Sequence, residues 1–193
     1  SLLSKPTSTP LPLMMLLMDY WPLRRLDRRA VLEKVPFFVL SAVFAVLAYV
    51  CEQRVNPLTL PAASAPLHLP LRLCYLIAFY FSKVVLPIHL SSVYTLPNPL
   101  SPGNPVVVAA VVGVVLLVAV LVLSRRWTPA LWVGVMMFLV GLAPTLGFIG
   151  YSWVAASDKY AYLPAVGLLL IAGWLLERVW SGGTAARQRV RRA

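Results

Sequence analysis

The sequence predicts an all-α protein, a polytopic bundle of transmembrane helices with about five spans and one re-entrant or interfacial helix. Of the 193 residues, 60% are hydrophobic and only 12% are charged, whereas about a quarter of a soluble domain is charged. The mean hydropathy of +0.82 agrees with a surface that lipid covers. Helix is the expected secondary structure, because lipid offers no partners for unpaired backbone groups and no barrel-like alternation is visible.

Six apolar stretches are the candidate helices. They cover residues 6–23, 35–51, 73–90, 106–123, 130–150 and 160–176. Since roughly 20 helical residues cross a hydrocarbon core of about 30 Å, the fourth and fifth stretches are long enough outright. The second and sixth are near the lower limit but end in aromatic residues, which suit the membrane interface. Many prolines, among them Pro22, Pro36 and Pro129, are expected to act as stops or first-turn residues. Pro144, inside the fifth stretch, predicts a kink or a broken helix.

The basic charge is concentrated beside the apolar stretches. The net charge is +11, and most positive residues fall into two clusters, at residues 24–34 and 178–192. Each cluster flanks a long apolar run, which is where cytoplasmic loops of membrane proteins keep Lys and Arg. This placement indicates a partner in the lipid bilayer and argues against nucleic-acid binding.

The two basic clusters also predict the topology. If both face the cytoplasm, an even number of crossings must separate them, yet five apolar stretches lie between. The third stretch is the one expected not to span, because Lys83 near its middle is costly in a bilayer. Arg125 and Arg126 then lie inside and residues 151–159 outside. We therefore expect a multi-pass membrane protein, with a transmembrane domain over residues 1–180 and a basic cytoplasmic tail over 181–193.

This topology places three polar clusters on the outer face. They are residues 4–6 with Lys5, the group of Lys83, His89 and Tyr94, and residues 157–162. Two or three lysines above an apolar groove can hold a phosphate as point charges. The alternative is structural, since a lysine beside a span often anchors it by reaching to the interface.

The remaining polar residues carry less chemistry. Asp19 is expected to pair with Arg24 or Arg25 at the inner interface, and Glu33–Lys34 reads as a solvated loop and helix start. His68 and His89 lack further ligands at metal spacing, so no metal site is expected. The cysteines, Cys51 and Cys74, form no redox or metal motif. No catalytic motif is recognisable.

Several short motifs, taken in order, resemble one family. They are LSKPT at 3–7, DYWPL at 19–23, EKVPF at 33–37, YFSK at 80–83 followed by Pro87, Leu90 and Tyr94, GLAP at 141–144, and SDKYAYLP at 157–164. Together they resemble the membrane region of bacterial proteins that couple a glycosyltransferase-C (GT-C) helical domain to tetratricopeptide repeats, relatives of eukaryotic protein O-mannosyltransferases. Lys159 stands where that family usually has arginine, which keeps the charge but loses the bidentate fork.

The resemblance implies a polyprenyl-phosphate-sugar-dependent glycosyltransferase of protein O-glycosylation, of which this is the C-terminal membrane portion. Lys5, Lys83 and Lys159 would bind the donor phosphate, and Tyr94, Asp158, Tyr160 and Tyr162 would line the groove. The catalytic carboxylate, with any divalent metal of the full-length enzyme, would lie upstream of Ser1, and the acceptor-binding repeats beyond Ala193. No catalytic residue or cofactor is therefore expected here, and the fragment alone should be inactive.

Two other classes remain open. A non-enzymatic membrane anchor or scaffold, for repeats or for an envelope assembly, is the main alternative and predicts no carboxylate-bearing external loop upstream. A transporter would call for inverted repeats or ionisable residues along a path, and the sequence shows neither.

Overall fold

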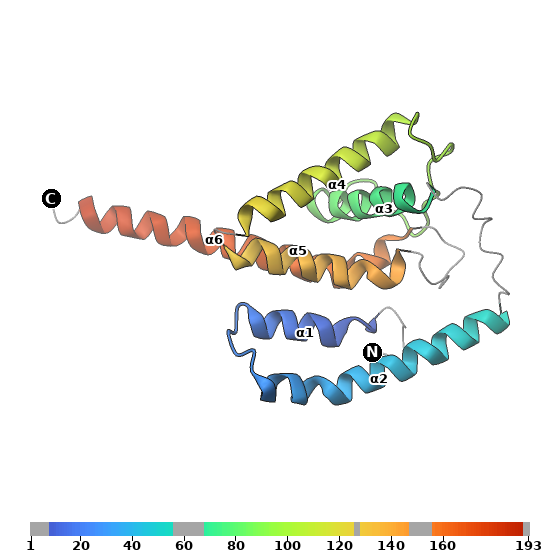
Figure 1. Cartoon of the computed structure of the whole chain (residues 1–193). Coiled ribbons are helices and arrows are strands. Elements are labelled where there is room, and N and C mark those ends of the chain that lie inside the picture. Colours follow the sequence, from blue (N-terminus) through green and yellow to red (C-terminus); the bar gives the residue numbers. More distant parts are fainter. Residues whose placement is uncertain (1–7, 56–67, 126–127, 147–155, 191–193) are drawn as a thin grey trace.

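The structure, a computed structural model, describes residues 8–55, 68–125, 128–146 and 156–190, and in this part it is helical throughout apart from turns, loops and one isolated bridge. The α-helices are α1 (Leu11–Tyr20), α2 (Arg28–Val55), α3 (His68–Val85), α4 (Pro105–Ser124), α5 (Pro129–Leu142) and α6 (Tyr162–Val190), with short 3₁₀ turns η2 (Ala143–Thr145) and η3 (Asp158–Tyr160). Most run roughly side by side (Figure 1). The all-α prediction is confirmed.

Three of the described helices are long and apolar enough to cross a membrane. They contain the segments Arg28–Cys51, Pro105–Ser124 and Tyr162–Ser181. The helices Leu11–Tyr20 and Pro129–Thr145 are apolar but shorter, and α3, which carries Arg72 and Lys83, is not one of the three. The count of five spans stays a prediction.

The fourth and fifth stretches begin as the sequence predicts, because each has a capping residue before a proline. The Asn104 side chain accepts a hydrogen bond from Val106 N at 3.0 Å, and the Thr128 hydroxyl accepts one from Ala130 N at 3.2 Å. Such bonds satisfy donors that a first helical turn leaves unpaired, and a proline at the first position has no donor to satisfy. The predicted kink or break at Pro144 is present as a break, since α5 ends at Leu142 and gives way to η2. Residues 147–150 of that stretch lie outside the described part.

Several boundaries differ from the sequence prediction. The third stretch is predicted at residues 73–90, but α3 covers His68–Val85 and places Lys83 in its last turn. The expectation that Lys83 lies near the middle of this segment is therefore wrong. The second stretch was expected to start at Val35 with Pro36 as a stop or first-turn residue, but α2 starts at Arg28 and Pro36 lies inside it. Asp27 explains the earlier start, because its side chain accepts a hydrogen bond from Ala30 N at 2.8 Å and so caps the helix. The sixth stretch is also longer, since α6 continues past residue 176 as far as Val190.

α5 lies at the centre of the bundle and packs against α1, α4 and α6. Its closest neighbour is α6, because glycines face one another across the pair. A Cβ on Gly134 would come within 2.7 Å of the Gly167 carbonyl oxygen, and a Cβ on Gly167 within 2.7 Å of Phe138 N. The two backbones are thus nearly in contact, an arrangement that small residues allow in membrane bundles.

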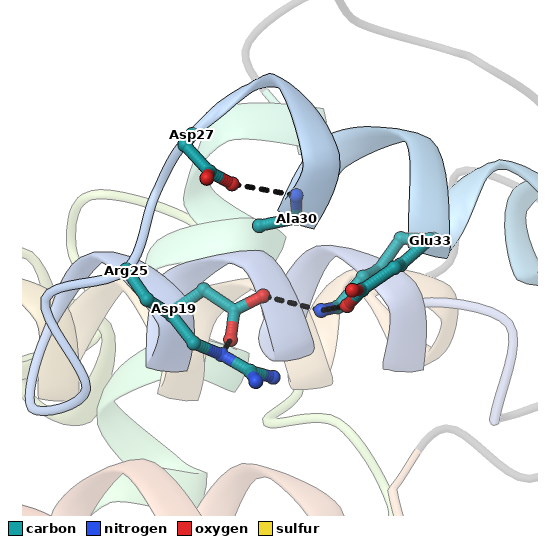
Figure 2. A network of polar contacts seen from close by, with 6 residues as sticks. Asp19, Arg25, Asp27, Ala30 and Glu33 are labelled. Carbon is teal, nitrogen blue, oxygen red and sulfur yellow. Dashed lines mark hydrogen bonds and ion pairs between the residues drawn. The ribbon is translucent and has the colours of Figure 1, made fainter.

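α1 and α2 form a hairpin tied by buried charges (Figure 2). Asp19 is only 1% exposed and Lys34 only 3%. Lys34 Nζ lies 2.5 Å from Asp19 Oδ2, and Arg25 Nε lies 2.6 Å from Asp19 Oδ1. The predicted pairing of Asp19 with Arg25 is confirmed. The reading of Lys34 as solvated is wrong, because α2 begins earlier than predicted and carries Lys34 against α1.

The two ends of the bundle differ in charge. The turn between α1 and α2, the end of α4 at Arg125 and the second half of α6 all lie at one end, which we call the arginine end (Figure 1). The first residues of α4 and α6 lie at the opposite end. The sequence argument requires that these three arginine-bearing segments share a side, and the fold brings them together.

Candidate functional site

At the end opposite the arginines, two segments distant in sequence are joined by backbone hydrogen bonds. Tyr94 N donates to Ala156 O at 2.9 Å, and Asp158 N donates to Ser91 O at 3.4 Å. Tyr94 and Ala156 form an isolated antiparallel bridge. The loop that follows α3 is therefore fixed to the segment that leads into α6, and we call the residues around this junction, Tyr80, Lys83, Tyr94, Ser157 and Asp158, the junction cluster.

Lys83 organises the loop after α3. Its ammonium donates to Ile88 O at 2.8 Å and to His89 O at 2.9 Å. The same Nζ lies 4.9 Å from the centre of the Tyr94 ring, within cation–π range. His89 has a φ of 50°, in the left-handed region, which is uncommon for a residue with a side chain. The predicted grouping of Lys83, His89 and Tyr94 is present, but His89 contributes its carbonyl oxygen, while the residue itself is exposed.

Asp158 receives two hydrogen bonds on one oxygen. Its Oδ2 accepts from Ser91 N at 2.5 Å and lies 2.9 Å from Tyr94 Oη. Tyr94 Oη is also 2.8 Å from His89 O, so its single proton can serve either acceptor. The polar contacts form a continuous series from Lys83 through His89 O and Tyr94 to Asp158.

Tyr80 connects the junction to the buried core of the bundle. It is 0% exposed and packs with Leu76 of α3 and Phe138 of α5. Its hydroxyl accepts a hydrogen bond from Ser157 N at 3.0 Å. Burial raises the pKa of Tyr80 to about 12, against the smaller opposing effect of that hydrogen bond, so the phenol stays neutral and polar at ordinary pH.

The other predicted site residues lie differently. Lys159 is exposed, with its ammonium 5.2 Å from the Tyr160 ring centre, and Tyr160 is partly buried against the core beneath the junction. Tyr162 is 79% exposed, so it contributes little to this cluster. Lys5 lies outside the described residues.

Sequence reasoning missed Tyr80 and the backbone of Ser91, and it placed Ser157 in a polar cluster without giving it a role. Tyr80 and Ser157 stand inside the quoted motifs, YFSK and SDKYAYLP, and the burial of a tyrosine hydroxyl normally requires a partner. No side-chain pattern marks Ser91, because it contributes its backbone.

Within the described ranges, no three His, Cys, Asp or Glu side chains come close enough to hold a metal ion. We therefore assign no metal ligands in this part of the chain.

Comparisons with protein-family models, with curated proteins and with solved structures returned no match.

Proposed function

We propose that this chain is the membrane portion of a GT-C-type glycosyltransferase that uses a polyprenyl-phosphate-linked sugar in protein O-glycosylation. It would contribute part of the site for the donor phosphate. The observation that carries the proposal is the meeting of Lys83, Tyr94 and Asp158 at one end of an apolar bundle. Charged groups near lipid are costly and commonly serve a substrate path. The two segments that supply them also carry motifs that resemble the family.

Lys83 suits a phosphate at the membrane surface. An ammonium group has three N–H donors, and the carbonyls of Ile88 and His89 accept two of them. The third remains for one anionic oxygen, while the Tyr94 ring restricts where the ammonium can move. Lys159, exposed on the adjoining segment, supplies a second positive charge. Both lysines act as point charges, which a tetrahedral phosphate accepts from several directions.

The proposed setting is the bacterial inner membrane with the arginine end in the cytoplasm, in keeping with the usual bias of Lys and Arg. The junction cluster would then face the outer side, where a polyprenyl carrier presents its sugar to a protein acceptor.

The test is sugar transfer by the full-length protein in membranes. Lys83→Met and Lys159→Met keep an apolar stem and remove the charge, and each should lower transfer roughly tenfold or more, because hydrogen bonds to charged groups are strong. Arg178→Met is the matched control. Arg178 is an exposed cation 4.9 Å from the Trp174 ring, in the second half of α6, and its loss should leave transfer unchanged. Normal transfer in both lysine variants would contradict the proposal.

One observation favours the alternative of a non-enzymatic anchor or scaffold. Among the described residues, Lys83 and Asp158 hydrogen-bond to the loop after α3, as expected of residues that join two segments. Under this alternative, Lys83→Met would lower the melting temperature, while the wild-type protein would bind no polyprenyl-phosphate sugar. Donor binding by the wild-type protein therefore separates the two functions.

A further inference from the structure

Two polar atoms in the junction cluster have no hydrogen-bond partner among the residues that the structure describes. They are Asp158 Oδ1 and Ser157 Oγ, and both are buried. Ser157 as a whole is 0% exposed. Buried polar atoms are nearly always paired, and an unpaired one carries a free-energy penalty. Two of them on neighbouring residues call for an explanation.

The structural role of Asp158 is already complete without Oδ1. The bonds to Ser91 N and Tyr94 Oη both fall on Oδ2, and these bonds hold the loop. Oδ1 is thus a free acceptor on a carboxylate that its neighbours keep in place. An ionised carboxylate accepts hydrogen bonds and cannot donate them, so the missing partner must be a hydrogen-bond donor.

Charge decides which part of a lipid-linked sugar fits this atom. A phosphate oxygen would be repelled by the carboxylate and belongs near the lysines, whereas a sugar hydroxyl can donate to it. A serine hydroxyl can both donate and accept, which also suits a hydroxyl ligand. The cluster would then bind the two parts of the donor at different residues. The phosphate would lie at Lys83 and Lys159, and the sugar at Ser157 and Asp158.

We infer that Asp158 Oδ1 accepts a hydrogen bond from a hydroxyl of the donor sugar and that Ser157 Oγ is available to the same sugar. This assignment rests on the proposed function. It adds that the junction cluster distinguishes a sugar-bearing lipid from the bare carrier, which lysines alone would not do.

The experiment compares two kinds of ligand on the full-length protein in lipid nanodiscs. One is a panel of polyprenyl-phosphate sugars (mannose, glucose, galactose and N-acetylglucosamine), and the other is the same polyprenyl phosphate without a sugar. Asp158→Asn keeps one oxygen for Ser91 N and Tyr94 and replaces the free acceptor with a donor. We expect the wild-type protein to prefer a sugar-bearing lipid. The variant should bind that lipid roughly tenfold more weakly, because the amide cannot accept the hydroxyl, and should bind the bare lipid unchanged.

Two further variants control for charge and folding. Asp27→Asn removes a carboxylate that caps α2 at the arginine end, and it should keep the preference for the sugar. Ser157→Ala removes only the hydroxyl Oγ and should weaken binding of the sugar-bearing lipid alone. If thermal unfolding shows that Asp158→Asn does not fold, Ser157→Ala tests the sugar assignment in its place.

The outcomes separate this inference from the proposed function. If the wild-type protein binds both lipids but shows no preference for any sugar, or if Asp158→Asn and Ser157→Ala keep that preference, the sugar assignment is wrong and the atoms hold an internal water only. The proposed function survives that result. If the wild-type protein binds neither lipid, the proposed function fails and the sugar assignment fails with it.

Discussion

The carboxylate of Asp19 in α1 lies 2.5 Å from the ammonium of Lys34 in α2, and only 2% and 4% of the two side chains are exposed. Arg25 takes the other carboxylate oxygen, so each oxygen of Asp19 faces its own cation (Figure 2). The α1–α2 hairpin is thus closed by an ion pair that almost no water reaches.

This pair predicts strong coupling between its members. Asp19→Asn or Lys34→Met alone leaves a buried charge without its partner and should lower the melting temperature by roughly 5 °C or more. The double variant Asp19→Asn with Lys34→Met removes both charges and should recover much of the loss. Glu33→Gln is the control, because Glu33 is 62% exposed at 3.3 Å from Lys34 Nζ and should matter little. Additive losses in the double variant would show that the two residues are not coupled.

The α5–α6 contact predicts which glycines tolerate a methyl group. Gly134→Ala and Gly167→Ala place a Cβ against backbone atoms of the facing helix and should each destabilise the protein by about 1–3 kcal/mol through overpacking. Gly173, also in α6, and Gly113 in α4 have nothing within 4 Å of such a Cβ, so their alanine variants should be neutral or slightly stabilising. Denaturation in detergent measures the difference, and equal effects at all positions would contradict the close approach.

Removing the Tyr80 hydroxyl should lower the stability of the protein, and the phenol itself should ionise only at high pH. Tyr80→Phe leaves the buried Ser157 N–H without its acceptor and should cost about 1–3 kcal/mol. Because burial raises the pKa of Tyr80 to about 12, the folded state favours the neutral phenol. That contribution to stability is fully present below the ordinary tyrosine pKa and is lost as the pH rises through about 12. Ultraviolet absorbance of tyrosinate should show that Tyr80→Phe lacks one group that ionises near pH 12 in the wild-type protein.

The charge difference between the ends predicts the sidedness of the chain. In a protein with Cys51→Ser and Cys74→Ser, a cysteine introduced by Lys159→Cys or Ser91→Cys should react with an impermeant reagent added outside the cell. One introduced by Arg125→Cys should react only after the membrane is opened. Labelling of Lys159→Cys and Arg125→Cys from the same side would contradict the topology.

The sequence predicts the positions of the helices better than the contacts between them. α4 begins one residue before the predicted start and ends one residue after the predicted end, because a cap, a proline and an unbroken apolar run all agree. Lys83, Tyr94 and Asp158 are predicted to share one face, and the structure brings them together in one cluster. The side of the membrane on which they lie stays a prediction.

The remaining features depend on tertiary packing that no local pattern encodes. Lys34 follows Glu33 and precedes a proline, which locally resembles a solvated helix start, and only the position of Asp19 on α1 shows why it is buried. The role of His89 is equally hidden, because it depends on a carbonyl oxygen and a left-handed backbone.

The near contact of Gly134 with Gly167 has a mechanical consequence for Asp158. Asp158 precedes α6 by only four residues. Ser91 and Tyr94, which belong to another segment, hold it by hydrogen bonds. One residue of α6 advances the helix by about 1.5 Å, so a slip of α6 along α5 by that step would exceed the tolerance of the bonds to Asp158. The glycine contact therefore fixes the position of α6 along α5 and, with it, the position of the carboxylate. Gly167→Ala should disturb the junction before α6 as well as the place where the methyl group is added.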